Sequence, residues 1–143
     1  MVNYFKKIVF LAALAPVFLF AKIHTVDNTP GNGAMYQSIA AAVSAASSGD
    51  TIIVMPSSTR YDNVAMDKKL FIYSRSGFGS SWEPDRTAFT QSIQFWAGSS
   101  GSKVSGFYLN PGSVEIGVSS AVQNVEVSYC YLVATNFRVY YQQ

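Results

Sequence analysis

The sequence predicts an all-β fold in which short parallel strands wind into a solenoid of about 23 residues per turn. Apolar side chains recur at this interval from position 70 onward, and one amphipathic helical segment precedes them. With 143 residues, 49% apolar and 13% charged, the chain can bury one core without disulfides. We therefore expect a single folded domain.

Residues 1–21 predict an export signal rather than part of this fold. Lys6 and Lys7 precede an apolar run, 8–20, and the small residue Ala21 ends it, as in a secretory signal peptide. The run is shorter than the roughly 20 apolar residues that a membrane span needs. We expect cleavage after Ala21, a secreted, cell-surface or periplasmic protein, and no stable membrane span afterwards. The alternative is an uncleaved N-terminal anchor.

Removal of the signal leaves a chain with almost no net charge. The sequence has 10 Lys and Arg against 8 Asp and Glu, and Lys6 and Lys7 leave with the signal. Nucleic-acid binding normally needs an excess of basic side chains, so we expect no nucleic-acid partner. Cys130 is the only cysteine, and we expect it to be buried and inert.

Local patterns place the elements that precede the repeat. Residues 22–26 predict a strand, and 27–33 a loop rich in turn-forming residues. Apolar residues at helical spacing predict a helix over 36–46 that Gly49 ends. The continuous apolar run 51–55 predicts a strand that is buried on both faces.

Self-comparison predicts the remaining strands. Two apolar columns, two positions apart, should face inward together. The first holds Leu70, Ile93, Ile116 and Val139, and the second holds Ile72, Phe95, Val118 and Tyr141. The segments 104–109 and 127–132 repeat at the same interval, whereas 75–91 predicts a protruding loop.

The motifs that carry a family resemblance are residues 39–54, Tyr61, 63–64, 68–70 and 101–107. With these segments the chain resembles the right-handed parallel β-helix proteins of the pectate-lyase-like superfamily. The resemblance implies a right-handed single-stranded parallel β-helix in which the helix over 36–46 caps the N-terminal end. Residues 22–143 would then be the N-terminal part of such a domain, truncated at its C-terminus.

The last predicted strand leaves an uncovered end. Val139 begins a further copy of the first inward strand, and the sequence stops at Gln143. Solenoids need covered ends to stay soluble. We expect that the sequence is a fragment, that a partner caps its last strand, or that copies self-associate end to end.

The sequence shows no catalytic or metal-binding constellation. Its eight acidic residues are scattered rather than stacked at the 23-residue interval. Glu83, Asp85 and Arg86 form the densest charged group, and we expect a solvated loop there rather than calcium ligands or an acid/base pair. His24 is the only histidine, and we expect it on the surface. We expect neither a cofactor nor a bound metal.

Four aromatic residues are the candidate binding residues. Tyr73 and Trp96 lie one 23-residue period apart, as do Tyr108 and Tyr131, and both pairs are opposite in phase to the inward columns. Each pair should therefore lie side by side on the outside of one sheet. Exposed rings on rigid strands can stack on sugars. The alternative is that the rings stack on one another or lie beneath the loop 75–91.

The resemblance also sets the expected class of ligand, because the family includes lyases and hydrolases of acidic and neutral polysaccharides. None of their catalytic motifs can be placed on this chain. We therefore expect an exported, non-catalytic module that binds polysaccharide or acts at the cell surface. The alternative is the N-terminal part of a polysaccharide lyase or glycoside hydrolase whose catalytic coils lie beyond residue 143.

Overall fold

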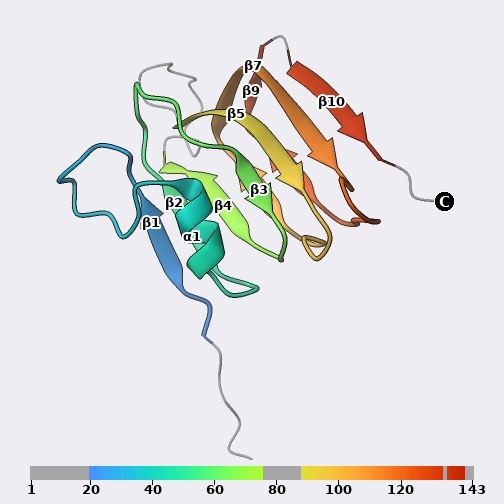
Figure 1. Ribbon diagram of the computed structural model, residues 1–143, viewed down its shortest axis with the longest axis horizontal. Helices are drawn as coiled ribbons and strands as arrows, with labels where there is room; N and C mark the ends of the chain where they lie inside the picture. The colour runs from blue at the N-terminus through green and yellow to red at the C-terminus, as the bar shows by residue number, and fades with distance from the viewer. Residues whose placement is uncertain (1–19, 76–87, 134, 141–143) are drawn as a thin grey trace, which may run out of the picture.

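Two parallel β-sheets and one helix make up the part of the chain that the computed structural model describes, residues 20–75, 88–133 and 135–140 (Figure 1). The elements are β1 (Ile23–Val26), α1 (Ile39–Ala45), β2 (Thr51–Val54), β3 (Val64–Met66), β4 (Phe71–Ser74), β5 (Ala88–Phe95), β6 (Lys103–Ser105), β7 (Phe107–Ile116), β8 (Glu126–Ser128), β9 (Tyr131–Leu132) and β10 (Thr135–Val139). Most of the predicted signal peptide and the charged group 83–86 lie outside the described residues.

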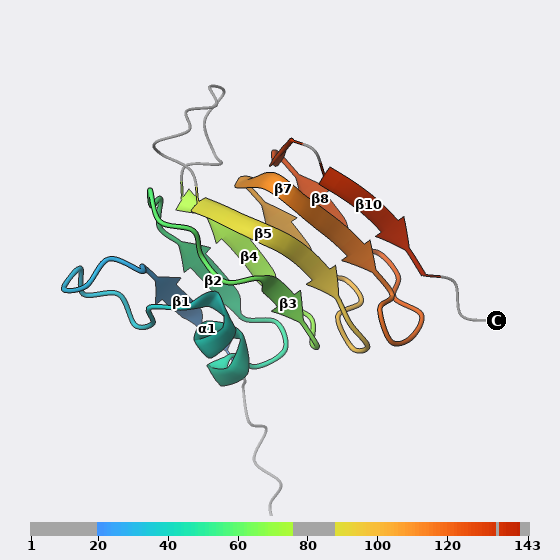
Figure 2. The ribbon, with the colours of Figure 1, turned by 45° about the horizontal axis from the view of Figure 1, so that its top comes forward.

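From β2 to β9 the chain alternates between the two sheets. The first sheet has the order β1-β2-β4-β6-β8, and the second has the order β10-β7-β5-β3, with β9 also pairing with β7. The strand pairs are parallel in both sheets. Figure 2 shows the second sheet in front of the first.

Apolar side chains from both sheets and from α1 form one core. Alternate residues of β2 and β4 are buried, because successive side chains of a strand point to opposite faces. The largest fully buried side chains include Phe95, Phe107, Ile39, Ile52, Met66, Leu70, Ile72 and Ile93. Burial of each such side chain contributes roughly 1.5 to 3 kcal/mol, so the core is the main source of stability.

The N-terminus of α1 is capped by two side chains. Ser38 Oγ accepts a hydrogen bond from the backbone of Ala41 at 3.1 Å. The Asp62 carboxylate accepts from the backbone nitrogens of Ile39 and Ala40 at 2.8 and 2.7 Å. These bonds satisfy N–H groups that have no partner within a helix. They fix α1 over the β1 end of the core (Figure 1).

The end of α1 differs from the prediction. The helix ends at Ala45 and its C-cap is Ala46, so Gly49 does not end it. Gly49 has φ +95° and donates its backbone N–H to the Lys69 oxygen at 2.8 Å. The glycine therefore serves the turn into β2 rather than the helix terminus.

The predicted fold class, an all-β coil with a constant period, is contradicted. The described residues form two separate parallel sheets and one helix, an α/β arrangement. A constant coil would place paired residues at one fixed separation along the chain. The first sheet instead pairs position 23 with 51, 51 with 71, 71 with 103, and 103 with 126. Paired positions of the first sheet are thus separated by unequal lengths of chain. Only the last separation, from 103 to 126, equals the 23-residue repeat of the sequence.

The predicted inward columns are confirmed in direction, since Leu70, Ile72, Ile93 and Phe95 are fully buried, but their stacking is wrong for the same reason. Leu70 and Ile72 lie at β4 of the first sheet, whereas Phe95 lies on β5 of the second. Phe95 pairs instead with Ile116, and only the next step, from Ile116 to Val139, keeps the predicted separation. The last residue of the second column, at position 141, lies outside the described residues.

Two further strand predictions have mixed outcomes. The repeat of 104–109 in 127–132 is confirmed, because Val104 pairs with Val127 and Leu109 with Leu132. The predicted loop 75–91 is wrong in its last part, since residues from Ala88 onward belong to β5. Residues 76–87 lie outside the described part of the chain. Within that part, no helix combines the length and the apolar character that crossing a membrane requires.

Candidate functional site

A bulge between β5 and β7 shapes the outer face of the second sheet. Thr90 pairs with Leu109 and Ser92 with Ser113, so the segment 110–112 of β7 lies opposite Gln91 alone. Such extra residues leave the ladder unpaired and bend the strand. The two strands touch at Gly112, where an added Cβ would lie 2.3 Å from the backbone oxygen of Gln91. The bulge therefore requires glycine at this position.

A pocket of about 390 Å³ opens beside this bulge. Pro111 and Gly112 form part of its wall. Side chains with hydrogen-bonding groups, from β5, β7, β10 and the residue before β3, form the rest: Asn63, Gln91, Ser92, Ser113, Glu115, Asn136 and Arg138. We call this the outer-face pocket.

Strand register explains why polar groups gather in the outer-face pocket. Ser92, Ser113 and Asn136 occupy paired positions on β5, β7 and β10. Two positions further along the same strands, Gln94, Glu115 and Arg138 are also paired. Because neighbouring parallel strands lie about 4.8 Å apart, each row presents a ladder of donors and acceptors.

The charged groups of the pocket neutralise each other. Arg138 Nη1 lies 3.7 Å from Glu115 Oε1, and Gln94 Nε2 donates to Glu115 Oε2 at 3.1 Å. The Glu115 side chain is 13% exposed, whereas that of Arg138 is 56% exposed. The carboxylate is therefore held in place from two sides, while the guanidinium, with five N–H donors, keeps donors for a ligand.

Ser92 contributes a hydroxyl group without a partner. The residue is 5% exposed, and within the described residues its Oγ makes no hydrogen bond. A buried hydroxyl in that state costs about 1 to 3 kcal/mol. Buried hydroxyls without a hydrogen-bond partner are rare in native proteins, and they usually have a functional role or contact a bound polar group. Ser92 lines the outer-face pocket, which gives the unpaired hydroxyl a functional explanation.

An aromatic row lies beside the bulge, and it confirms part of the prediction. The ring centroids of Tyr108 and Tyr131 are 5.6 Å apart, and those of Phe89 and Tyr108 are 5.2 Å apart, each pair tilted by 33°. Arg60 Cζ lies 4.5 Å from the Phe89 centroid. Tyr108 and Tyr131 therefore lie side by side, as predicted, and Tyr131 is 43% exposed. Stacking of these rings on a sugar stays a prediction.

Tyr73 and Trp96 are not neighbours, which corrects the other predicted pair. Tyr73 lies on β4 of the first sheet, where it pairs with Ser105. Trp96 follows β5 of the second sheet, and its backbone N–H donates to the Met66 oxygen at 2.8 Å. The 23-residue offset fails here because the connection between β4 and β6 is longer.

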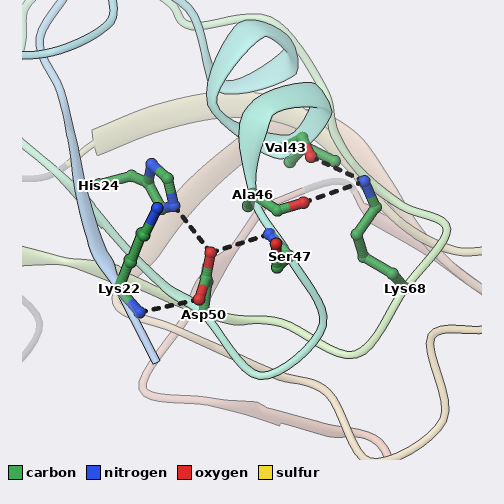
Figure 3. A network of polar contacts seen from close by, with 7 residues as sticks. All are labelled: Lys22, His24, Val43, Ala46, Ser47, Asp50 and Lys68. Carbon is green, nitrogen blue, oxygen red and sulfur yellow. Dashed lines mark hydrogen bonds and ion pairs between the residues drawn. The ribbon is translucent and has the colours of Figure 1, made fainter. Parts of the chain in front are cut away.

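His24 and Asp50 form a buried polar cluster that the sequence reasoning missed (Figure 3). His24 Nε2 lies 2.9 Å from Asp50 Oδ2, and the two residues are 7% and 3% exposed. The backbone nitrogens of Lys22 and Ser47 each donate to the same carboxylate at 2.8 Å. The prediction of a surface histidine is therefore wrong. The parallel pairing of β1 with β2, which brings these residues together, leaves no local pattern in the sequence.

The neighbours of Asp50 in this cluster shift its pKa. Burial by itself raises the pKa of Asp50, but hydrogen bonds from Lys22, His24 and Ser47 outweigh it and lower the pKa to about 2. A second pocket, of about 530 Å³, adjoins β1 and is lined by Lys22, Ile23, His24, Met35 and Tyr36. Because Asp50 receives donors from β1 and from the loop after α1, the cluster ties these segments together.

Cys130 is partly buried, whereas we predicted a buried thiol. Its Sγ lies 3.3 Å from the Ser128 oxygen. Burial raises the pKa of the Cys130 thiol, more than hydrogen bonding to nearby backbone lowers it. A higher pKa leaves less of the reactive thiolate. Within residues 20–75, 88–133 and 135–140, no three His, Cys, Asp or Glu side chains gather where they could hold a metal ion.

Comparisons of the chain with protein-family models, with curated proteins and with solved structures gave no match. The resemblance to the pectate-lyase-like superfamily therefore stays a prediction from the sequence.

Proposed function

We propose that this chain is an exported, non-catalytic carbohydrate-binding module that holds sugar hydroxyl groups in the outer-face pocket. The observation that carries the proposal is the lining of this pocket, in which amides, hydroxyls, a carboxylate and a guanidinium converge. Its volume of about 390 Å³ falls within the range of small-ligand pockets, roughly 300 to 1,000 Å³. A sugar unit of an oligosaccharide fits this description.

The pocket supplies the hydrogen bonds that neighbouring sugar hydroxyls use. Each hydroxyl both donates and accepts, as do the side-chain amides of Asn63, Gln91 and Asn136. Glu115 adds acceptors, and Arg138 adds donors. Hydrogen bonds to charged groups contribute more than neutral ones, about 1.5 to 3 kcal/mol each. We expect Arg138 and Glu115 to contribute most to affinity.

The carboxylate content of the pocket favours binding over cleavage. Most glycosidases use a pair of carboxyl groups on either side of the scissile bond. Glu115 is the only carboxylate among the lining residues, and Arg138 and Gln94 already engage it. Because the two charges in the pocket balance, we expect a neutral glycan to bind better than one that carries uronic acids.

The test is binding of the exported protein to soluble neutral oligosaccharides, measured by calorimetry. Arg138→Gln should weaken binding about tenfold or more, because it removes a charged donor. Lys103→Gln is the matched control, since Lys103 pairs with Glu126 at 2.9 Å on the other sheet, and it should bind as the wild type does. Equal affinity of Arg138→Gln and wild type, or no neutral glycan bound, would contradict the proposal.

A second variant tests the charge argument. Glu115→Gln removes the negative charge and leaves Arg138 without its ionic partner. We expect this variant to bind uronic-acid oligosaccharides more tightly than the wild type does. An unchanged preference would show that the charge balance does not select the ligand.

A further inference from the structure

The backbone nitrogen of Lys22 is bound to a buried carboxylate. It donates to Asp50 Oδ1 at 2.8 Å (Figure 3), and Asp50 is 3% exposed. Among the described residues, Asp50 forms an ion pair with His24 alone, and that pair is ionic only when the imidazole is protonated. Lys68, the nearby cation, donates instead to the oxygens of Val43 and Ala46 at 3.1 and 3.3 Å.

The sequence predicts that a peptidase cuts the chain at this same nitrogen. The expected signal-peptide cleavage breaks the bond between Ala21 and Lys22. Both residues are exposed, and both precede β1, which starts at Ile23. The bond is therefore accessible, and the atom that it frees already lies against Asp50.

We propose that signal-peptide removal converts this hydrogen bond into a part-buried ion pair between the new N-terminal ammonium of Lys22 and the Asp50 carboxylate. Signal peptidase hydrolyses the amide with one water molecule: the hydroxyl joins the Ala21 carbonyl carbon, and a proton joins the Lys22 nitrogen. The amine then takes up a further proton at neutral pH. The cleavage site is thus also a stabilising site of the mature fold.

The position of β1 makes this ion pair matter for the fold. β1 is the edge strand of the first sheet and pairs with β2 along Ile23–Val26. An isolated bridge between Val26 and Tyr36 holds its far end. At its near end, Asp50 receives both the Lys22 nitrogen and the His24 ring. The ionised carboxylate already assists the existing hydrogen bond, and a full charge on the nitrogen adds a Coulomb attraction between two unit charges, which strengthens that attachment.

The inference rests on the export step of the proposed function but not on carbohydrate binding, and its test has two parts. The full-length chain is expressed with its signal, and the exported product is sequenced from its N-terminus by mass spectrometry. We expect the first residue to be Lys22. A product that starts at another residue overturns the proposal.

The second part measures how the charge on the Lys22 α-amine changes the stability of the fold. The α-amine of the exported protein is selectively acetylated at mildly acidic pH, where lysine side chains stay protonated. The acetyl group restores an amide where Ala21 stood, so it removes the charge without adding bulk beyond that of the precursor. We expect the unfolding equilibrium constant in urea at pH 6 to rise about tenfold or more. An unchanged constant overturns the proposal.

A matched variant assigns the effect to Asp50. In Asp50→Asn the acetylated and free forms should have the same stability, because no carboxylate faces the amine. In Lys22→Ser, which keeps the α-amine, acetylation should act as it does in the wild type. The wild-type comparison needs no substitution, so it decides the proposal even if Asp50→Asn does not fold.

Discussion

The two sheets share parallel pairing, but they differ in regularity. The four strand pairs of the first sheet run without a shift in register, whereas β5 and β7 of the second shift between Thr90 and Ser92. Each sheet carries a cross-strand ion pair on its outside. In the first sheet, the side chains of Lys103 and Glu126 are each about half exposed. In the second sheet, the side chain of Glu115, which pairs with Arg138, is 13% exposed. The break in register, rather than the residue types, makes the pocket.

The largest effect is expected at the buried carboxylate that anchors the regular sheet. Asp50→Ala removes the acceptor for two backbone N–H groups and for His24. We expect the free energy of unfolding in urea to fall by about 3 kcal/mol. Asp67→Ala is the control, because this exposed carboxylate lies 3.7 Å from Lys68 and such pairs contribute little. Equal losses in the two variants would mean that Asp50 does not anchor the sheet.

The next effect concerns the irregular sheet. Gly112→Ala places a Cβ about 2.3 Å from the Gln91 oxygen, so β5 and β7 must separate. We expect a loss of about 2 to 3 kcal/mol in the free energy of unfolding, as in other overpacked sites, together with loss of glycan binding. Ser113→Ala, the next residue, should change stability much less. If Gly112→Ala is as stable as Ser113→Ala, the bulge is looser than the contact implies.

The acid dependence of stability should also distinguish the sheets. The pKa of Asp50 is about 2 in the folded protein, below its ordinary value of 3.8. The contribution of its ionised form is thus present above about pH 4 and is lost as pH falls through 2. We expect a loss of about 1 to 2 kcal/mol in unfolding free energy between about pH 5 and pH 2 that is absent in Asp50→Ala. If the wild type and Asp50→Ala lose the same unfolding free energy in acid, the loss comes from other carboxylates.

The smallest effect is expected at the exposed ion pair of the first sheet. Lys103 and Glu126 contact each other at 2.9 Å, and each keeps about half of its side chain in solvent. The contact raises the pKa of Lys103 and lowers that of Glu126, chiefly through their hydrogen bond. Solvent screens such pairs, so Glu126→Gln should leave the urea midpoint unchanged within error. A clear shift would show that the two outer faces are less different than their exposure suggests.

The elements that local pattern controls were predictable from the sequence. The strand at 51–54 and the helix at 39–45 appear close to their expected bounds, 51–55 and 36–46. Alternating burial and helical spacing act over neighbouring residues, so the sequence shows them directly. The short strand at 64–66 was missed, because so short a segment gives too little alternation to detect.

Long-range register was the part that could not be predicted. Tyr108 and Tyr131 were placed together correctly, because the connection between their strands has the 23-residue length assumed throughout. Tyr73 and Trp96 were misplaced because they belong to different sheets, and the residue that pairs with Tyr73 is Ser105. The bulge left one signal that could have been used, the Asn110-Pro111-Gly112 run. Proline and glycine inside a strand indicate a break in its pairing.

The alternation between sheets also has a consequence for how the chain is made. Paired residues of neighbouring strands lie close together along the chain, from positions 88 and 107 at the nearest to 71 and 103 at the farthest. Apart from β1 and β3, which begin the two sheets, each strand has a partner that has already been translated. Each new strand therefore needs only one strand that already exists, although parallel pairing of this kind forms more slowly than pairing between neighbouring residues. Both sheets can therefore lengthen strand by strand in the order in which the ribosome delivers them.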